Sequence, residues 1–424
     1  MIKRIKKYFS KNEFIKNSLI MVSGTTLAQV LPILLSPVIT RLYKPEDFGV
    51  LAIFTSLSVI FIIFANGKYD IAILLPKKES YGINLLFLNF ILAAGVSLIL
   101  LIIILVFHDK IILFYKAPRL GKWLYLLPVV VFFLAGRTSL SYYLMRFKDY
   151  KLISKIKVAS ASSISIIQIG LFFFKNGVLA LISGYSIGHI VAYFGMMRSV
   201  LKRKELLKKI QRAKMIALAK QYKKFPLVQM PSALVGRISR ELPNLLITPI
   251  FGAEVLGFFS LGFRILSAPS SLIGTSISQV FMQYINEKLQ KNASIIGTFK
   301  SVLKKLLIIS IPIFTILAIF SEPLFGFIFG KQWTESGLYV QILSPMFLVR
   351  FITVALTSVL YVLEKHKLIF NLQLSMLFLA LLIFGITFLL KISVINFFVI
   401  YSISFTLYYL VYFYFIWLSV KKVG

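Results

Sequence analysis

Long apolar segments alternate with short polar ones along the whole chain. Many of the apolar segments extend for about twenty residues, the length that a helix needs to cross the hydrocarbon core of a bilayer. The pattern predicts about twelve membrane-spanning helices, and the predicted fold class is an all-α polytopic membrane protein. The expected spans are residues 17–40, 46–66, 81–107, 122–145, 151–174, 177–200, 225–250, 254–280, 301–321, 335–361, 367–390 and 393–419.

Composition agrees with this interpretation and limits the chemistry. Hydrophobic residues make up 58% of the chain, and the mean hydropathy is +0.88, both beyond the range of soluble domains. The absence of cysteine excludes disulfides, thiolate metal sites and cysteine nucleophiles. The histidines His108, His189 and His366 do not have the spacing of metal ligands. The sequence also contains no catalytic pair or triad, so we expect no metal, no cofactor and no enzymatic activity.

The net charge of +34 is explained by its location. In a soluble protein such a charge suggests nucleic-acid binding, but here lysine and arginine concentrate in alternate loops. That distribution follows the positive-inside rule. It predicts that both termini are cytoplasmic and that nucleic acid is not a partner. The opposite loops are shorter and poorer in cations, with the exception of residues 108–122.

A strongly basic segment separates two halves of nearly equal length. Residues 201–224 contain ten basic residues and one acid, Glu205. We interpret this segment as a cytoplasmic linker that includes an amphipathic helix on anionic lipid. The predicted domains are therefore an N-terminal six-helix bundle at 1–200, the linker at 201–224 and a C-terminal six-helix bundle at 225–424.

The two halves resemble each other in sequence. Glu46-Asp47-Phe48-Gly49-Val50 corresponds to Glu254-Val255-Leu256-Gly257-Phe258, each at the start of the second helix of its half. Lys151-Leu152-Ile153 likewise matches Lys367-Leu368-Ile369, each at the start of the fifth helix. Six helices, an even number, lie between the matches, so both halves should have the same orientation. We expect two pseudo-symmetric bundles related by an axis along the membrane normal.

Five arginines lie inside the apolar segments, where almost no acidic residues accompany them. They are Arg137, Arg237, Arg240, Arg264 and Arg350. A cation near the bilayer centre costs about 2.5–3.5 kcal/mol on insertion scales, so it persists only beside a partner or a water-filled cavity. The partner that suits these residues is an anion. The sequence therefore predicts transport of a negatively charged substrate.

Polar residues also gather on one side of several expected helices, at about 100° per residue. In the seventh helix an arc of roughly 120° contains Gln229, Arg237, Arg240, Glu241 and Asn244. The eighth helix carries Arg264 in a stripe of serines and glycines, and the first helix presents Gln29 on a narrow polar face. Helix packing explains the small residues, but arginine is too large for a tight seam. We expect these faces to line a central cavity.

Simpler explanations stay open for several of the cations. Arg137 and Arg350 can reach the membrane surface by snorkelling if the helix boundaries are displaced. Lys155 and Lys157 lie one turn from a helix start, and we expect them to snorkel.

Neutralisation by an acid on the same helix is a further alternative to a role in binding an anionic substrate. Arg237 and Glu241 are four residues apart and can form an ion pair. Arg240 and Arg264 are the two cations that are hardest to explain without a cavity.

Three segments carry a resemblance to a known family. Lys68-Tyr69-Asp70-Ile71-Ala72-Ile73-Leu74-Leu75-Pro76 resembles the RYE-x-A-I-x-L-P segment after the second helix of bacterial oligosaccharide flippases, with Lys68 and Asp70 in place of arginine and glutamate. The run from Ser239-Arg240-Glu241-Leu242-Pro243-Asn244 to Pro269 is similar to the seventh and eighth helices of that family. Phe325-Gly326 to Phe329-Gly330, followed by Trp333, is similar to its pattern before the tenth helix.

The resemblance covers essentially the whole chain. It is to polysaccharide-transport members of the multidrug/oligosaccharidyl-lipid/polysaccharide exporter superfamily. It implies alternating access by two bundles in the bacterial cytoplasmic membrane, and a substrate of undecaprenyl-pyrophosphate-linked oligosaccharide, an intermediate of O-antigen, capsule or related polysaccharide assembly. The partners it implies are membrane lipids, a polysaccharide polymerase and chain-length machinery.

Site residues follow from both lines of reasoning. We expect the substrate-binding residues to be Arg237, Arg240, Arg264, Arg350, Arg137 and Gln29. A pyrophosphate needs cations to cross a low-dielectric region, and arginine binds phosphate oxygens in a bidentate manner. The sequence has no Walker motif. Coupling to a proton or sodium gradient is an open alternative, with Glu241 as the candidate carboxylate.

Two rival functions are considered. A cation or drug antiporter of the same superfamily needs membrane-embedded carboxylates, and this chain has few. An integral-membrane polysaccharide polymerase acts on the same lipid carrier but usually has a large external loop with catalytic residues. The longest external loop expected here, residues 108–122, contains a single acid, Asp109.

Overall fold

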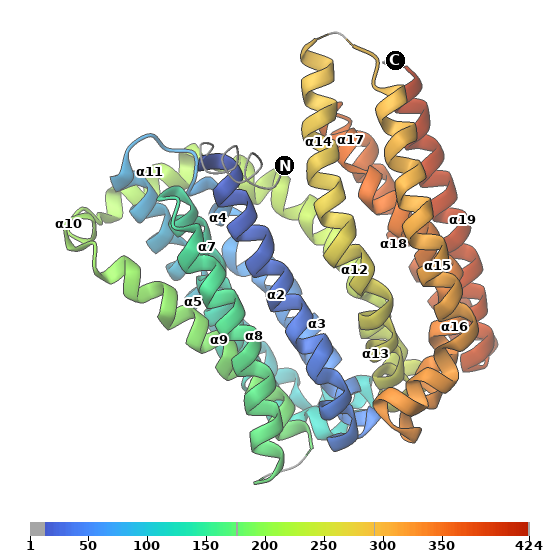
Figure 1. Ribbon diagram of the computed structural model, residues 1–424. Coiled ribbons are helices and arrows are strands. Elements are labelled where there is room, and N and C mark those ends of the chain that lie inside the picture. The colour runs from blue at the N-terminus through green and yellow to red at the C-terminus, as the bar shows by residue number, and fades with distance from the viewer. Residues whose placement is uncertain (1–12, 175–176, 292, 423–424) are drawn as a thin grey trace, which may run out of the picture. The chain divides into compact units, whose positions relative to one another are not determined.

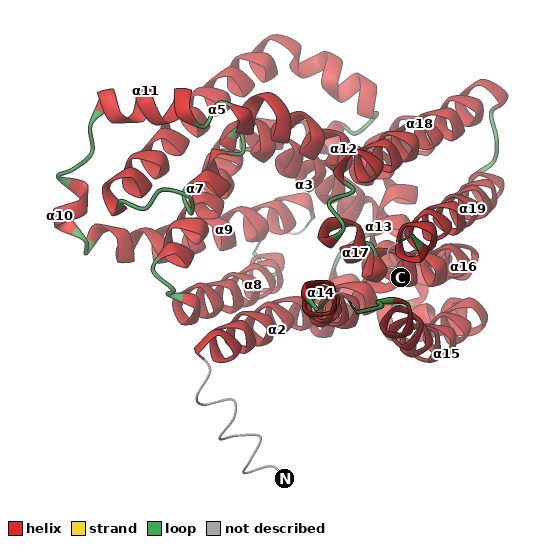
Figure 2. Ribbon diagram, turned by 90° about the horizontal axis from the view of Figure 1, so that it is seen from above, coloured by secondary structure: helices red, strands yellow, loops and turns green. Residues whose placement is uncertain are grey.

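The computed structural model describes residues 13–174, 177–291 and 293–422, and these residues form helices joined by loops, without strands (Figure 1, Figure 2). Contacts between residues divide the chain into two units. The first unit comprises Met1–Tyr43 and Val50–Leu234, and the second comprises Lys44–Gly49 and Val235–Gly424. The all-α class predicted from the sequence is confirmed for the described residues.

The first unit holds the N-terminal helices and the basic segment. Its elements are α2 (Glu13–Leu42), α3 (Pro45–Asn66) from Val50 onward, α4 (Tyr69–Ala72), α5 (Glu79–Tyr115), η1 (Pro118–Leu120), α6 (Gly121–Leu124), α7 (Leu127–Arg146), α8 (Tyr150–Phe172), α9 (Val178–Leu201), α10 (Lys204–Leu207), α11 (Arg212–Gln221) and the π-helical turn η2 (Phe225–Gln229). Residues 201–224, expected to be a separate linker, thus belong by their contacts to this unit.

Small residues set the close packing of α8 in the first unit. On one side α8 packs against α2, where the Ser154 hydroxyl donates a hydrogen bond of 2.9 Å to the carbonyl oxygen of Ile20. On the other side it packs against α9, where Ser160 donates a hydrogen bond of 2.8 Å to the carbonyl oxygen of Gly188. Serine and glycine let the helix backbones approach closely, as expected between helices in lipid.

The second unit contains the C-terminal helices. After the five residues at the start of α3, its elements are α12 (Met230–Phe251) from Val235 onward, α13 (Ala253–Pro269), the π-helical turn η3 (Ser270–Gly274), α14 (Thr275–Gln290), α15 (Ile296–Phe329), η4 (Lys331–Trp333), α16 (Thr334–Leu356), α17 (Ser358–Val362), α18 (His366–Leu390) and α19 (Val394–Lys421). Helix α16 packs against α13, α15 and α19 and forms the middle of the unit.

Eleven helical segments in the described part of the chain are long and apolar enough to cross a membrane. The remaining expected span, residues 225–250, corresponds to α12. This helix has 22 residues and is therefore about 33 Å long at 1.5 Å per residue. Helix α12 is less apolar because it contains Arg237, Arg240 and Glu241. The prediction of about twelve membrane helices is confirmed, and the least apolar of them carries two of the six expected substrate-binding residues, Arg237 and Arg240.

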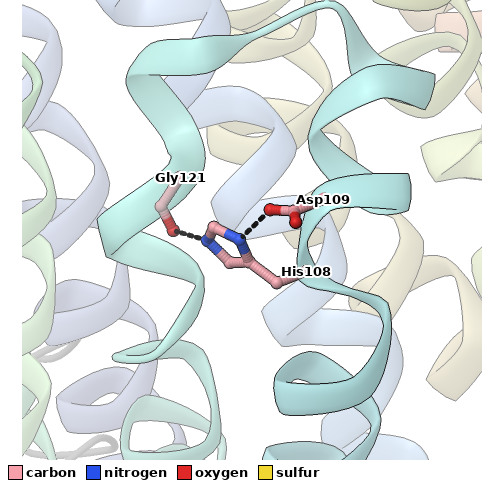
Figure 3. A network of polar contacts seen from close by, with 3 residues as sticks. All are labelled: His108, Asp109 and Gly121. Atoms are coloured by element: carbon pink, nitrogen blue, oxygen red, sulfur yellow. Dashed lines mark hydrogen bonds and ion pairs between the residues drawn. The ribbon is translucent and has the colours of Figure 1, made fainter.

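The expected external loop at residues 108–122 is wrong in its boundaries. Helix α5 continues to Tyr115 because the residues after 107 remain largely apolar, and η1 and α6 occupy most of the segment between α5 and α7. Figure 3 shows the contact that holds the end of α5. The Nδ1 atom of His108 lies 2.9 Å from Asp109 Oδ1, and its Nε2 lies 3.2 Å from the carbonyl oxygen of Gly121. This His108 contact joins α5 to α6.

The two repeated motifs meet within the second unit. A Cβ added to Gly49 would lie 1.8 Å from the carbonyl oxygen of Ala253, and a Cβ added to Gly257 would lie 1.7 Å from the carbonyl oxygen of Pro45. These contacts are reciprocal. Gly49 touches Ala253, which lies four residues before Gly257, and Gly257 touches Pro45, which lies four residues before Gly49. Only glycine allows this backbone approach.

Substitution of Gly257 by Ala should lower the melting temperature of the purified protein in detergent. The added methyl would force the backbone of Pro45 away, and such overpacking costs roughly 1–3 kcal/mol. The control is Gly385→Ala in α18 of the same unit, where an added Cβ meets no atom within 4 Å. Equal melting temperatures for the two variants would contradict the importance of this contact.

A buried carboxylate lies in the short helix α4 of the first unit. Asp70 is 4% exposed, and its Oδ1 has no hydrogen-bond partner among the described residues. Burial raises the pKa of the Asp70 carboxyl above its ordinary value, although the charge of Lys68 and hydrogen bonds from backbone amides act in the opposite direction. The folded unit therefore holds this proton more tightly than the unfolded chain does.

The free energy of unfolding should consequently fall as the pH rises from the pKa of Asp in the unfolded chain, about 3.9, to the raised pKa of Asp70 in the folded protein. Replacement of Asp70 by Asn should raise the melting temperature at pH 8 and have a smaller effect near pH 4. Glu205→Gln, which removes an exposed carboxylate from the same unit, should change neither value appreciably. A melting temperature that decreases in Asp70→Asn at pH 8 would show that the hydrogen bonds of the carboxylate outweigh its burial.

Candidate functional site

Three basic side chains come together in the first unit. Arg137 lies in the middle of α7, Lys157 on α8 and His189 on α9. Lys157 and His189 both lie within the electrostatic range of Arg137, and all three side chains are half-buried. In the described part of the chain, neither Arg137 nor Lys157 forms an ion pair with a carboxylate.

Some buried polar atoms of this group and of the neighbouring helix α2 have no partner among the described residues. The Nε of Arg137, the Nδ1 of His189 and the Oε1 of Gln29 are buried without a hydrogen-bond partner among the described residues. Helix α2 contributes Gln29 and also Thr25, whose hydroxyl lies 3.2 Å from the Nζ of Lys157. Buried polar atoms usually have partners, so this group has unused capacity to bind an anionic, hydrogen-bonding ligand.

In the second unit, a charged cluster occupies α12. Arg237 forms an ion pair of 3.2 Å with Glu241, as the spacing of four residues indicated. The Asn244 amide donates a hydrogen bond of 3.1 Å to the other oxygen of the same carboxylate. Arg240 lies within the electrostatic range of both ion-pair partners and of Arg350, and its side chain is exposed. Glu241 therefore compensates at most one of these arginines.

Arg350 on α16 lies against aromatic rings. Its guanidinium carbon is 4.8 Å from the ring centre of Phe347 and 5.0 Å from that of Phe263, so its charge is partly stabilised by cation–π contacts. Tyr409 on α19 lies within the electrostatic range of both Arg350 and Arg240. The contacts therefore link α12, α16 and α19 in one polar cluster.

Arg264 is separate from this cluster. It lies on α13, and its side chain is exposed. Among the described residues it has no hydrogen bond or ion pair. Its grouping with the other arginines stays a prediction from the sequence, as does the substrate-binding role of Arg137, Arg237, Arg240, Arg350 and Gln29.

Sequence reasoning missed two members of the first cluster. Lys157 was expected to snorkel, but it instead donates a hydrogen bond to Thr25 inside the unit. His189 has no sequence signal that separates it from an ordinary packed histidine, and it contacts the ring of Tyr185 at 4.5 Å between ring centres. Lys155, by contrast, is exposed as expected. The described residues contain no group of His, Asp or Glu that could hold a metal ion.

Comparison with known sequences identifies related proteins. The model of a family described as polysaccharide biosynthesis protein matches residues 38–338. The teichuronic acid biosynthesis protein TuaB of Bacillus subtilis is 25% identical over 131 residues, which are 31% of this chain and 27% of TuaB. The capsular polysaccharide biosynthesis protein CapF of Staphylococcus aureus is 30% identical over 158 residues, 36% of this chain and 39% of CapF. The alignments thus span less than half of each relative.

Comparison with solved structures shows the fold. The lipid II flippase MurJ in an inward closed conformation has a TM-score of 0.76 at 16% identity, over 96% of this chain and 90% of MurJ. An inward-facing multidrug resistance transporter of the MATE family, in the MOP superfamily, has a TM-score of 0.72 at 11% identity, over 95% and 94% of the two chains. The architecture expected from the sequence resemblance is confirmed.

The two kinds of arginine should respond differently to substitution by methionine, which retains the apolar length of the side chain. Arg137→Met should raise the melting temperature, because it removes an unpaired cation that lies near Lys157 and His189. Arg237→Met should lower it, because Glu241 loses its ion-pair partner. We expect roughly 1–3 kcal/mol in the second case, less than for a fully buried pair.

Thermal unfolding of both variants in the same detergent provides the measurement. Arg198→Met, at an exposed position in the last turn of α9, is the control and should melt like the unsubstituted protein. A lowered melting temperature in Arg137→Met would mean that Arg137 has a stabilising partner.

Proposed function

Because the chain belongs to the polysaccharide biosynthesis protein family, we propose that it is a flippase for lipid-linked oligosaccharide. The proposed substrate is undecaprenyl-pyrophosphate-linked oligosaccharide, moved from the cytoplasmic to the periplasmic leaflet. The observation that carries the proposal is the excess of cations over carboxylates inside the membrane helices of each unit. Such an excess is costly without an anion to compensate it.

A pyrophosphate fits the chemistry of these groups. It presents several oxygens with negative charge, and arginine donates two parallel hydrogen bonds to such oxygens. In the second unit Arg240 is exposed and has no dedicated carboxylate, which leaves its donors free for a ligand. In the first unit Arg137 has a donor, and Gln29 an acceptor, that is buried without a partner among the described residues.

The sugar part of the substrate needs neutral hydrogen-bonding groups. Tyr409 near Arg240 and Arg350, and Thr25 with Gln29 on α2, are groups of this kind. We propose that they contact the oligosaccharide while the lipid tail stays in the bilayer. Transport by alternating access would then transfer the headgroup, with its charge compensated, through a region that otherwise excludes anions.

The names of relatives support a place in polysaccharide assembly. Teichuronic acid and capsular polysaccharide biosynthesis are the processes named for TuaB and CapF, and MurJ, which shares the fold, is a lipid II flippase. We propose that this chain acts between the enzymes that build a lipid-linked unit and a polymerase that consumes it. The bacterial inner membrane and cytoplasmic termini remain predictions from the charge distribution.

A drug or cation antiporter is the second candidate, because a multidrug transporter shares the fold. Cation transport needs carboxylates exposed to the substrate. The carboxylate identified in the cluster of the second unit is Glu241, and it already accepts from Arg237 and Asn244. The charge balance of the cluster therefore favours an anionic substrate.

Transport of labelled lipid-linked oligosaccharide into reconstituted vesicles tests the proposal. Arg240→Ala and Arg264→Ala should each reduce the rate at least tenfold, because a charge-assisted hydrogen bond is worth about 1.5–3 kcal/mol. Protein levels in the membrane should be unchanged. Arg198→Ala should retain the full rate, because Arg198 is exposed in the last turn of α9 and lies outside both clusters.

The same vesicles separate the rival interpretations. Full transport by both variants would rule out these arginines as substrate ligands, and competition by organic cations would favour the antiporter. Imposed pH and sodium gradients address the coupling role proposed for Glu241, which predicts a gradient-dependent rate that is lost in Glu241→Gln. A rate that is insensitive to both gradients would argue against that role.

A further inference from the structure

The basic segment is docked on the first unit by specific contacts. The Asn84 amide of α5 donates a hydrogen bond of 3.0 Å to the carbonyl oxygen of Lys209, and its oxygen accepts one of 2.8 Å from the backbone N–H of Gln211. The Tyr69 hydroxyl donates to the carbonyl oxygen of Ala219 at 2.9 Å. Leu218 is 3% exposed and lies in the core of the unit. Helix α11 therefore has a fixed position beside α5 (Figure 2).

A groove lies where α11 passes α5. Its volume is about 500 Å³, within the range of sites that hold a small molecule. The apolar part of its lining comes from both helices and consists of Leu88, Ile91, Met215, Ile216 and Ala219. The polar part consists of three cations, Arg212, Lys220 and Lys223. None of the lining residues is acidic.

The sequence of α11 places these residues on one side of the helix. At 100° per residue, Arg212, Met215, Ile216, Ala219 and Lys220 fall within an arc of roughly 140°. Leu218 lies on the other side, where it packs into the core. Arg212, Lys220 and Lys223 are all exposed, so their charges are available to a ligand. Helix α11 thus uses one face for docking, and its other face presents apolar and basic side chains together.

The floor of the groove continues onto the lipid-facing side of α5. Ile91 is 57% exposed, and Leu98 and Ile102 are 60% and 52% exposed. These three residues fall within an arc of roughly 40° on α5 at 100° per residue. Exposed apolar side chains on a membrane-spanning helix are covered by lipid chains. An acyl chain in the bilayer can therefore follow α5 directly to Ile91 and into the groove.

We propose that this groove binds an anionic phospholipid. The phosphate and any further headgroup charge lie against Arg212, Lys220 and Lys223, and one acyl chain lies on the apolar floor formed with Leu88 and Ile91. Both halves of the lining are needed to select this ligand. A free phosphate would use only the cations, and a neutral phospholipid would use only the apolar floor.

A phospholipid in the groove would also restrict the movement of the connection between α11 and α12. Helix α11 leads through η2 into α12, and η2 exposes Leu227 and Val228, which are 69% and 65% exposed. A bound lipid fixes α11 at the membrane surface, where those apolar side chains also enter lipid. The phospholipid is therefore a structural ligand of the basic segment and is distinct from the transported substrate.

Native mass spectrometry of the purified full chain, titrated with phosphatidylglycerol, tests the proposal. The variant that replaces Arg212, Lys220 and Lys223 by Gln should bind roughly a hundredfold more weakly, because each cation near a membrane surface contributes about a factor of five. The matched control replaces Lys202, Lys204 and Lys209 by Gln. It removes the same charge from exposed positions outside the groove and should bind like the unsubstituted chain.

Three comparisons show whether the groove recognises the headgroup charge, phosphate alone or the acyl chain. Phosphatidylcholine with the same acyl chains should bind weakly, and inorganic phosphate should neither bind tightly nor displace phosphatidylglycerol. Ala219→Trp, which fills the groove without changing its charge, should also weaken binding, so that the result does not depend on the triple variant alone. Equal affinity of the groove variant and its control, or equal binding of phosphatidylcholine, would overturn the proposal. Because no transport is measured, the result is separate from that of the flippase proposal.

Discussion

An excess of positive over negative charge within the helices is the constraint that both units share. In the first unit Arg137 lies near Lys157 and His189, and the described residues provide no ion pair for Arg137. In the second unit Glu241 pairs with Arg237, while Arg240 and Arg350 lie near that pair. Such groups weaken a helix bundle in lipid. They do not contribute to stability, and the anionic substrate proposed above would compensate their charge.

The helices that hold these groups depend on small residues at their crossings. In the second unit Gly49 and Gly257 of the two repeated motifs make reciprocal backbone contacts with Ala253 and Pro45. Phe48 of the first motif packs edge-to-face on Trp333, with ring centres 4.9 Å apart. The sequence repeat is thus also a structural one, in which matching residues make matching contacts, as in an isologous interface. This arrangement explains why a glycine stands at the same place in both motifs.

The two proposals concern two groups of cations, and the surroundings of these groups differ. The arginines of the first group lie within the long helices α7, α12 and α16. Arg137 has a buried Nε without a partner among the described residues, and Arg350 packs on aromatic rings. The cations of α11 are exposed at the edge of an apolar groove that continues along α5. We therefore propose the same electrostatic attraction to phosphate for both groups, with a transported headgroup in the first case and a resident phospholipid in the second.

The sequence by itself determined the helical class, the approximate number of spans, the repeat and the positions of charge within apolar segments. Hydropathy and charge depend only on the residue types along the chain, so the sequence is sufficient to predict these features. It ended α5 too early, because the polar residues His108, Asp109 and Lys110 interrupt the apolar run, whereas the helix continues through them to Tyr115. Only the tertiary structure decided that Lys157 contacts Thr25, that Arg350 packs against Phe263 and Phe347, and that α11 docks through Leu218. These relations depend on which helices pack together, and a helical period gives the face of a residue but not the neighbour that it meets.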